Sequence, residues 1–153
     1  MNDEHSPPAL LPLIVADVFE LAGRFRAGGE TIASAVGQTQ ARWQVMSAAS
    51  GGRHTVPQIA RRLGVTRQNV QRIADLLVAE GSAAFEANPD HRGSPLLILS
   101  RRGLAALEQI GKSADGYHAR LSRKLGASDL RTLHRGLRRL LEAVAASNPP
   151  GKP

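Results

Sequence analysis

The stretch from Thr66 to Gly81 restricts the possible folds of this chain more than any other, because it predicts a short amphipathic helix with a recognisable residue at each end. Its apolar side chains recur at the spacing of a single helical face: Val70, Ile73, Leu76 and Leu77. Thr66 can cap the first turn with its hydroxyl, and Gly81 can end the helix. The polar side chains near the amino-terminal end are suited to base edges and phosphates, and no carboxylate precedes Asp75: Arg67, Gln68, Asn69, Gln71 and Arg72.

The segment immediately upstream, Thr55 to Gly64, predicts a second short helix. Thr55 is its cap, Pro57 is tolerated in its first turn, and Gly64 ends it. Two short helices joined by a tight, glycine-containing turn are typical of a helix-turn-helix, which places its second helix in the major groove of DNA. The alternative is a helical hairpin of a bundle, whose charges form only a solvated face.

Charge favours the first interpretation. The 153-residue chain carries a formal net charge of +7. From Thr31 to Ala74 it contains no acidic residue, and this window includes six arginines: Arg42, Arg53, Arg61, Arg62, Arg67 and Arg72. A polyanionic partner, most simply nucleic acid, explains a positive window that coincides with the helix-turn-helix.

Composition also excludes several classes of protein. The chain has no cysteine, so disulfides and thiolate chemistry are excluded. No apolar run has the roughly 18 residues of a membrane span, and the acidic start at Asp3 and Glu4 differs from a secretory leader, so we expect a soluble cytoplasmic protein. The five histidines lack the pairing of a zinc site, and no catalytic constellation or phosphate-binding glycine loop is present. We therefore expect neither an enzyme nor a bound metal or cofactor.

A β-hairpin is predicted directly after the helix-turn-helix. The segments 82–86 and 95–99 flank a loop rich in turn-forming residues, Asn88 to Ser94. Arg92 lies in this loop, where an extended arginine can enter a minor groove. We expect Asp90 to hold Arg92 or to cap the turn. A hairpin in this place is the wing of a winged helix.

Long amphipathic helices are predicted on both sides of this domain. The first covers 10–26, is interrupted by Gly28 and Gly29, and continues at 30–36 for a further turn or two. After the wing, one helix runs from Ser100 to Gly126, and another, capped by Ser128 and Asp129, completes the fold. These helices are too long and too apolar to be buried against a small winged helix, so we expect them to pack across a two-fold axis.

The predicted fold class is therefore mainly α with a small β-hairpin wing, a winged helix-turn-helix with N- and C-terminal dimerisation helices. The predicted division is an N-terminal dimerisation helix and its extension at 1–36, a DNA-binding domain at 37–100, dimerisation helices at 101–147 and a disordered tail at 148–153.

Three local motifs occur in a familiar order along the chain. A helix starts with Gly37, Gln38, Thr39 and, four residues later, Trp43; the wing contains Asp90 and Arg92; and Leu99-Ser100 followed by Gly103 leads into the long helix. In this order the chain resembles the multiple-antibiotic-resistance regulator (MarR) family over almost its whole length. It departs from the family pattern at Gln38, at Gly81-Ser82-Ala83 and at Asn88, which bears on the rigidity of the wing.

The resemblance implies a dimeric winged-helix transcription factor, commonly a repressor, often released from DNA by a small aromatic or phenolic effector. It places three residues near the family's effector pocket: Arg42, Trp43 and Met46. For Trp43, core packing is the favoured alternative.

The sequence thus predicts a sequence-specific regulator that binds a pseudo-palindromic operator in double-stranded DNA as a homodimer. The predicted DNA contacts are Arg53, Arg61, Thr66, Arg67, Gln68, Asn69, Gln71, Arg72, Asp90, Arg92 and Ser94. Two other classes stay open. A winged-helix protein-interaction module would share the fold without specific DNA binding, and a small enzyme on a helical bundle would need a convergent set of titratable groups.

Overall fold

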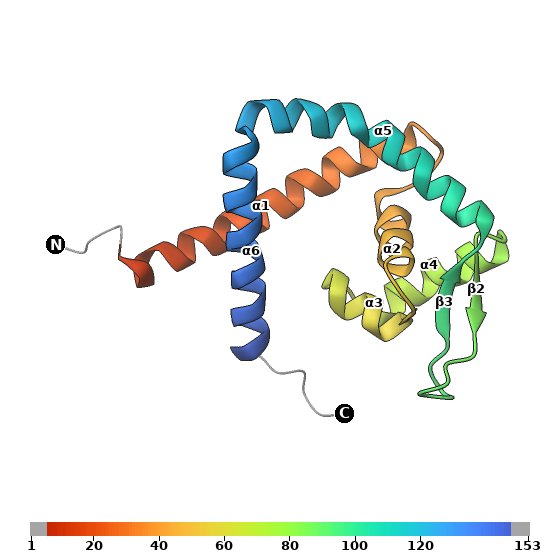
Figure 1. The fold of residues 1–153 in the computed structure, drawn as a ribbon. Coiled ribbons are helices and arrows are strands. Elements are labelled where there is room, and N and C mark those ends of the chain that lie inside the picture. The colour runs from red at the N-terminus through yellow and green to blue at the C-terminus, as the bar shows by residue number, and fades with distance from the viewer. Residues whose placement is uncertain (1–5, 148–153) are drawn as a thin grey trace. The chain divides into compact units, whose positions relative to one another are not determined.

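The computed structural model describes residues 6–147, so the predicted disordered tail at 148–153 lies outside the described residues. The chain divides into two compact units, the first ending at Ala114 and the second beginning at Asp115. The first unit contains a winged helix, and the second continues helix α5 and adds α6 (Figure 1). The structure is mainly helical with one small antiparallel sheet, which confirms the predicted fold class.

The first helix, α1 (Pro7–Ser34), is continuous, so the predicted interruption at Gly28 and Gly29 was wrong. Gly29 is buried where α2 approaches, and a Cβ atom added there would lie 2.6 Å from Cγ of Gln40. The backbone N–H of Gln40 donates to the Glu30 carboxylate at 2.9 Å. Glycine costs a helix interior about 1 kcal/mol relative to alanine. Here its lack of a side chain permits close packing, which offsets that cost.

Three threonine caps place the next helices where the sequence predicted them. These are α2 (Gln40–Ser50), α3 (Val56–Leu63) and α4 (Arg67–Ala79). Each helix begins one residue after a threonine whose hydroxyl accepts a backbone N–H of the first turn: Thr39, Thr55 and Thr66. The chain leaves α3 through Gly64 at φ 65° and leaves the turn after α4 through Gly81 at φ 74°, both in the left-handed region that favours glycine.

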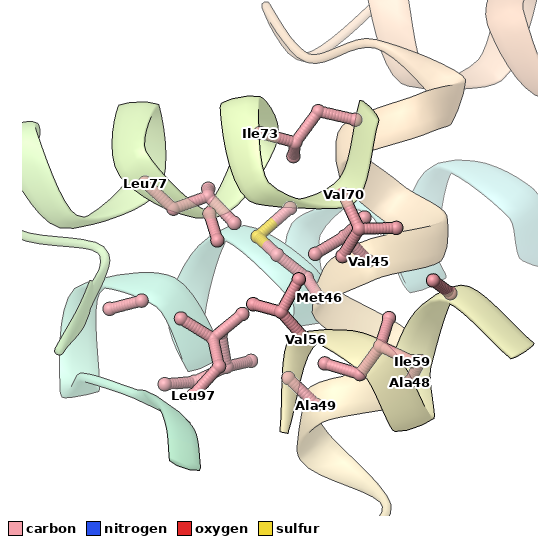
Figure 2. Close-up of a cluster of buried hydrophobic side chains, with 14 of the residues drawn as sticks. Val45, Met46, Ala48, Ala49, Val56, Ile59, Val70, Ile73, Leu77 and Leu97 are labelled. Carbon is pink, nitrogen blue, oxygen red and sulfur yellow. The ribbon is translucent and has the colours of Figure 1, made fainter. Parts of the chain in front are cut away.

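The core of the winged helix lies between α2, α3, α4 and the sheet. Figure 2 shows Met46 of α2 pointing toward α4, close to Val70 and Leu77. Leu76, predicted on this buried face, is instead 44% exposed, whereas Ala74 is fully buried. The buried face of α4 is therefore Val70, Ile73, Ala74 and Leu77. Helical phase places the small Ala74 on the buried face and turns the larger Leu76 toward solvent.

The sheet has three strands in the order β1-β3-β2: β1 (His54–Thr55), β2 (Ala83–Glu86) and β3 (Leu96–Leu99). Antiparallel pairing of β2 with β3, from Ala83 opposite Leu99 to Glu86 opposite Leu96, confirms the predicted hairpin. The two-residue strand β1 was not predicted, because it is too short to have a periodic pattern and exists through its pairing with β3.

A tight junction joins the hairpin to α5 (Arg101–Leu125). The backbone N–H of Ser100 donates to the carbonyl of Ser82 at 3.0 Å, and the Ser100 hydroxyl donates to the carbonyl of Gly81 at 2.7 Å. That hydroxyl also accepts the backbone N–H of Gly103 at 3.2 Å. A Cβ at Gly103 would lie 2.0 Å from the Ser82 carbonyl oxygen, so only glycine fits there. These contacts explain structurally why Leu99-Ser100 is followed by Gly103 at the start of the long helix.

In the second unit, α6 (Ala127–Ser147) begins directly after Gly126, which has a φ of 78°. Ser128 and Asp129 therefore lie in its first turn, and the prediction that they cap the helix was wrong. The carbonyl of Gly126 already accepts the backbone N–H of Leu130 at 3.2 Å, so helical hydrogen bonding starts before Ser128.

Large apolar side chains of α1 and α6 are exposed in the single chain. On α1, Phe19 is 74% exposed, and α6 has no buried residue. The exposed side chains of α6 share one face: Leu133, Leu137, Leu141 and Val144. Within residues 6–147, none of the helices combines the length and the hydropathy of a transmembrane span.

Candidate nucleic-acid interface

The first two turns of α4 present an uncovered polar surface. Arg67, Gln68 and Arg72 are exposed, and Gln71 is half-buried beside them. Together with Asp75 they line one shallow surface depression. The backbone N–H groups of a helix start attract anions, and this first turn has no acidic side chain to oppose them. Thr66 itself is occupied in capping the helix, because its hydroxyl accepts the N–H of Asn69 at 3.2 Å.

Two hydrogen-bonded pairs organise part of this surface. The side-chain amide of Gln71 donates to the Asp75 carboxylate at 2.8 Å. Arg72 donates to the amide oxygen of Asn69 at 3.4 Å, which is a long contact. Within the described part of the chain, the side chains of Arg67 and Gln68 have no such partner. These two side chains are therefore the most available of the predicted base-reading set.

A second groove, with a volume of about 660 Å³, separates the helix-turn-helix from the wing. Three guanidinium groups from separate parts of the chain line it: Arg53 in the loop before β1, Arg61 in the last turn of α3 and Arg67 at the start of α4. The wing contributes Asn88, Asp90, His91, Gly93 and Ser94. Arg67 borders both depressions, so the two form one continuous surface.

Asn88 holds the loop of the wing together. Its amide donates to the carbonyl of Ser94 at 3.0 Å, and its amide oxygen accepts the backbone N–H of Asp90 at 3.1 Å. The backbone N–H of His91 donates to the Asn88 carbonyl at 3.3 Å. Asn88 thus bridges both sides of the loop, and its departure from the family pattern does not leave the turn without support.

The prediction that Asp90 holds Arg92 or caps the turn was wrong. Among residues 6–147, no ion pair joins Asp90 to Arg92, and the turn is capped by the side chain of Asn88 rather than of Asp90. Both Asp90 and Arg92 are exposed at the tip of the wing. Arg92 therefore reaches solvent without the partner that the sequence suggested.

Arg53 is paired with a residue of the wing. Its guanidinium lies 3.2 Å from the Glu86 carboxylate at the end of β2, and both side chains are largely exposed. Such a pair contributes at most about 1 kcal/mol to stability. A stronger anion could therefore compete with Glu86 for Arg53.

The three residues assigned to an effector pocket have other roles in this structure. Met46 is fully buried in the core, and Trp43 is half-buried against it. The guanidinium of Arg42 donates to both carboxylate oxygens of Glu80 and, at 3.0 Å, to the amide oxygen of Gln38. The pair ties the start of α2 to the end of α4. The effector site stays a prediction.

The hydrogen bond from Arg42 holds the pKa of Glu80 below its usual value and raises the pKa of Arg42. A lowered carboxyl pKa means that the unfolded state binds more protons, so the stabilisation is present above the ordinary pKa of 4.5 and is lost as pH falls through the lower folded-state value.

We expect Glu80→Gln to reduce the free energy of unfolding by no more than about 1 kcal/mol at pH 7, because the Glu80 side chain is 39% exposed. The difference between the two proteins should shrink as pH falls below 4.5. Urea denaturation of both proteins across this range measures it. A difference that is independent of pH would show that ionisation of Glu80 is not its source.

The sequence did not predict the side-chain contacts of three residues on this surface. Asp75 follows Gln71 by one helical turn, so the i, i+4 spacing could have indicated their hydrogen bond. Asn88, followed by Pro89 and Asp90, has the composition of a side-chain-capped turn. The pairing of Glu86 with Arg53 has no local signal, because it depends on the register of the sheet.

Comparison with known proteins identifies the family. A model of the MarR family matches residues 39–92, which contain α2, the helix-turn-helix, strand β2 and the first part of the wing loop. An uncharacterised protein of Mycobacterium tuberculosis is 48% identical over 136 residues, covering 89% of this chain and 95% of the relative.

Solved structures share the fold. A MarR family transcriptional regulator from Silicibacter pomeroyi has a TM-score of 0.80 at 20% identity, covering 95% of this chain and 99% of that chain. A mutant MarR from E. coli, in a complex with operator DNA, has a TM-score of 0.69 at 23% identity, covering 86% of this chain and 95% of that chain. With the family match on the helix-turn-helix, the match of fold along nearly the whole chain and the motifs of the wing, this chain belongs to the MarR family.

Proposed function

We propose that this protein is a sequence-specific transcriptional regulator that binds double-stranded DNA as a homodimer. The observation that carries the proposal is the continuous surface formed by the start of α4 and the groove beside the wing, with Arg53, Arg61 and Arg67 on it. An exposed helix start suits the major groove, and an exposed wing tip with Arg92 suits the neighbouring minor groove. The solved relative in a complex with operator DNA supports the same use of the fold.

The exposed apolar faces of α1 and α6 support the homodimer. An uncovered row of leucines on α6 is costly in water, at about 25 cal/mol for each Å² of apolar surface. In this proposal, residues 1–36 and 101–147 serve dimerisation and residues 37–100 bind DNA. A two-fold dimer requires a pseudo-palindromic site, with half-sites about 34 to 36 Å apart. Bound over a promoter, such a dimer would act as a repressor.

Gln68→Ala should weaken binding to the preferred duplex by about 1 to 3 kcal/mol per half-site and relax the preference at one base position. Gln68 is exposed in the first turn of α4, without a competing partner in the described chain. Binding to a panel of duplexes with single base-pair changes measures both effects. Gln109→Ala, at an exposed position of α5, is the control and should change neither. If Gln68→Ala lowers affinity equally for every duplex, Gln68 does not read a base.

Arg92→Ala should lower affinity for every duplex and leave the base preference in the major groove nearly unchanged. On each subunit, the slope of log affinity against log salt should fall by about 0.9 for each phosphate that Arg92 neutralises in the unchanged protein. Titration of one duplex at several salt concentrations measures the slope. Arg139→Ala removes the same charge from an exposed position of α6 and should leave the slope unchanged. Equal changes in both variants would mean that the wing does not touch the DNA.

A further inference from the structure

We propose that Asp75 is a specificity-determining residue, which fixes the orientation of the Gln71 amide so that Gln71 presents a single hydrogen-bonding pattern to DNA. The inference deepens the proposed function and rests on it. It starts from the hydrogen bond of 2.8 Å between Nε2 of Gln71 and Oδ1 of Asp75.

The chemistry of the two groups makes this orientation unique. An ionised carboxylate only accepts hydrogen bonds, whereas an amide has a donating and an accepting end. If the Gln71 amide rotated by half a turn, its oxygen would face the carboxylate of Asp75, and two acceptors would repel each other. Asp75 therefore selects the rotamer in which the amide oxygen of Gln71 points away from it.

The position of the pair makes this orientation relevant to base reading. Gln71 and Asp75 are one helical turn apart, and both line the depression on α4 with Arg67, Gln68 and Arg72. The face from Gln68 through Gln71 to Asp75 follows the spacing of neighbouring residues on a helix surface. Asp75 is farther along α4 than the residues of the first turn, so it acts through Gln71 as a positioning residue.

An oriented amide has a defined preference. Glutamine pairs bidentately with adenine, accepting from N6 and donating to N7. An amide free to rotate can offer either end, so it discriminates less between bases and loses rotational freedom on binding. The carboxylate of Asp75 also opposes phosphates, which weakens binding to non-cognate DNA. The single acidic side chain on this surface of α4 therefore raises specificity at the expense of affinity.

The test compares Asp75→Asn, Asp75→Glu and Gln71→Ala with the unchanged protein. Asp75→Asn preserves size but can donate as well as accept, so it releases the constraint on Gln71. Affinity for random duplex should rise roughly two- to fivefold as the charge is removed. Discrimination at one base position in each half-site should fall at least about fivefold, the lower end of what one bidentate pair supplies. Asp75→Glu retains the carboxylate and should retain the preference.

Two controls separate this role from charge and from folding. Asp115→Asn makes the same change of charge at an exposed position of α5 and should leave the base preference intact. The urea midpoint of each Asp75 variant should match that of the unchanged protein, because the side chain is exposed. In the Gln71→Ala background, Asp75→Asn should no longer alter the preference at that base position.

The outcomes distinguish this inference from the proposed function. If the unchanged protein prefers one duplex and Asp75→Asn shifts affinity for all duplexes by the same factor, Asp75 contributes charge alone and the inference is overturned. The same holds if Asp75→Asn alters the preference equally with and without Gln71. A protein that has no preference among duplexes would overturn the proposed function itself, and this inference with it.

Discussion

Replacing Gly103 by alanine should destabilise the winged helix by about 2 to 4 kcal/mol. The added Cβ would lie 2.0 Å from the carbonyl oxygen of Ser82 and 3.5 Å from Cβ of Leu99. Moving Ser82 away from the start of α5 to make room for this Cβ would break the hydrogen bond from Ser100 to the Ser82 carbonyl. Overpacking of this kind costs about 1 to 3 kcal/mol, and breaking the hydrogen bond adds about 1 kcal/mol. Urea denaturation at a fixed protein concentration measures the loss.

Gly111→Ala provides the matched control on the same helix. A Cβ at Gly111 meets no atom within 4 Å, so the substitution should stabilise α5 by about 0.5 to 1 kcal/mol through helix propensity alone. Opposite signs for the two variants are the expected result. If Gly103→Ala did not lower the free energy of unfolding any more than Gly111→Ala does, the result would contradict the close packing of Gly103 against Ser82.

Removal of residues 128–153 should abolish the homodimer and weaken binding to a pseudo-palindromic duplex about 10²- to 10⁴-fold. The deletion removes the exposed leucine face of α6, which the proposed dimer buries. A monomer would lose the advantage of binding its second half-site from the same molecule, which is typically worth that factor. Light scattering together with duplex titration measures both losses. A full-length protein that is monomeric at micromolar concentration and still binds specifically would contradict the prediction.

A point substitution distinguishes loss of the dimer from loss of the fold. Leu137→Arg places a charge on the leucine face of α6 and should separate the subunits. Arg138→Gln changes the neighbouring, exposed position and should leave the dimer intact. Because both residues lie beyond the winged helix of the first unit, each variant should retain binding to a single half-site.

The features that the sequence predicted correctly have local causes. Thr55 and Thr66 cap their helices through N–H groups three residues away, and Gly64 and Gly81 have the left-handed conformations expected of helix ends. The hairpin was predictable because Asn88 to Ser94 contains the residues that turns require. In each case the physical cause lies within a few residues of its effect.

Several of the errors concern features decided by distant parts of the chain. Gly29 suggested a helix break, yet the approach of Gln40 makes glycine useful inside α1. Strand β1 exists only because His54 and Thr55 meet β3. Similarly, Arg53 was predicted to contact DNA and Arg42 to lie near an effector pocket. Only the fold shows that Glu86 pairs with Arg53 and Glu80 with Arg42. Side-chain partners between elements depend on register and packing, which a single sequence does not contain.

Selection of bound duplexes from a random pool tests whether this protein binds DNA with sequence specificity. The selected duplex and a scrambled version of it are titrated with the full chain at two salt concentrations. We expect a pseudo-palindromic motif, bound at least about 10³-fold more tightly than the scrambled duplex, with both affinities falling as salt rises. Equal affinity for the two duplexes, or no motif after selection, would show that the protein does not recognise a specific DNA sequence.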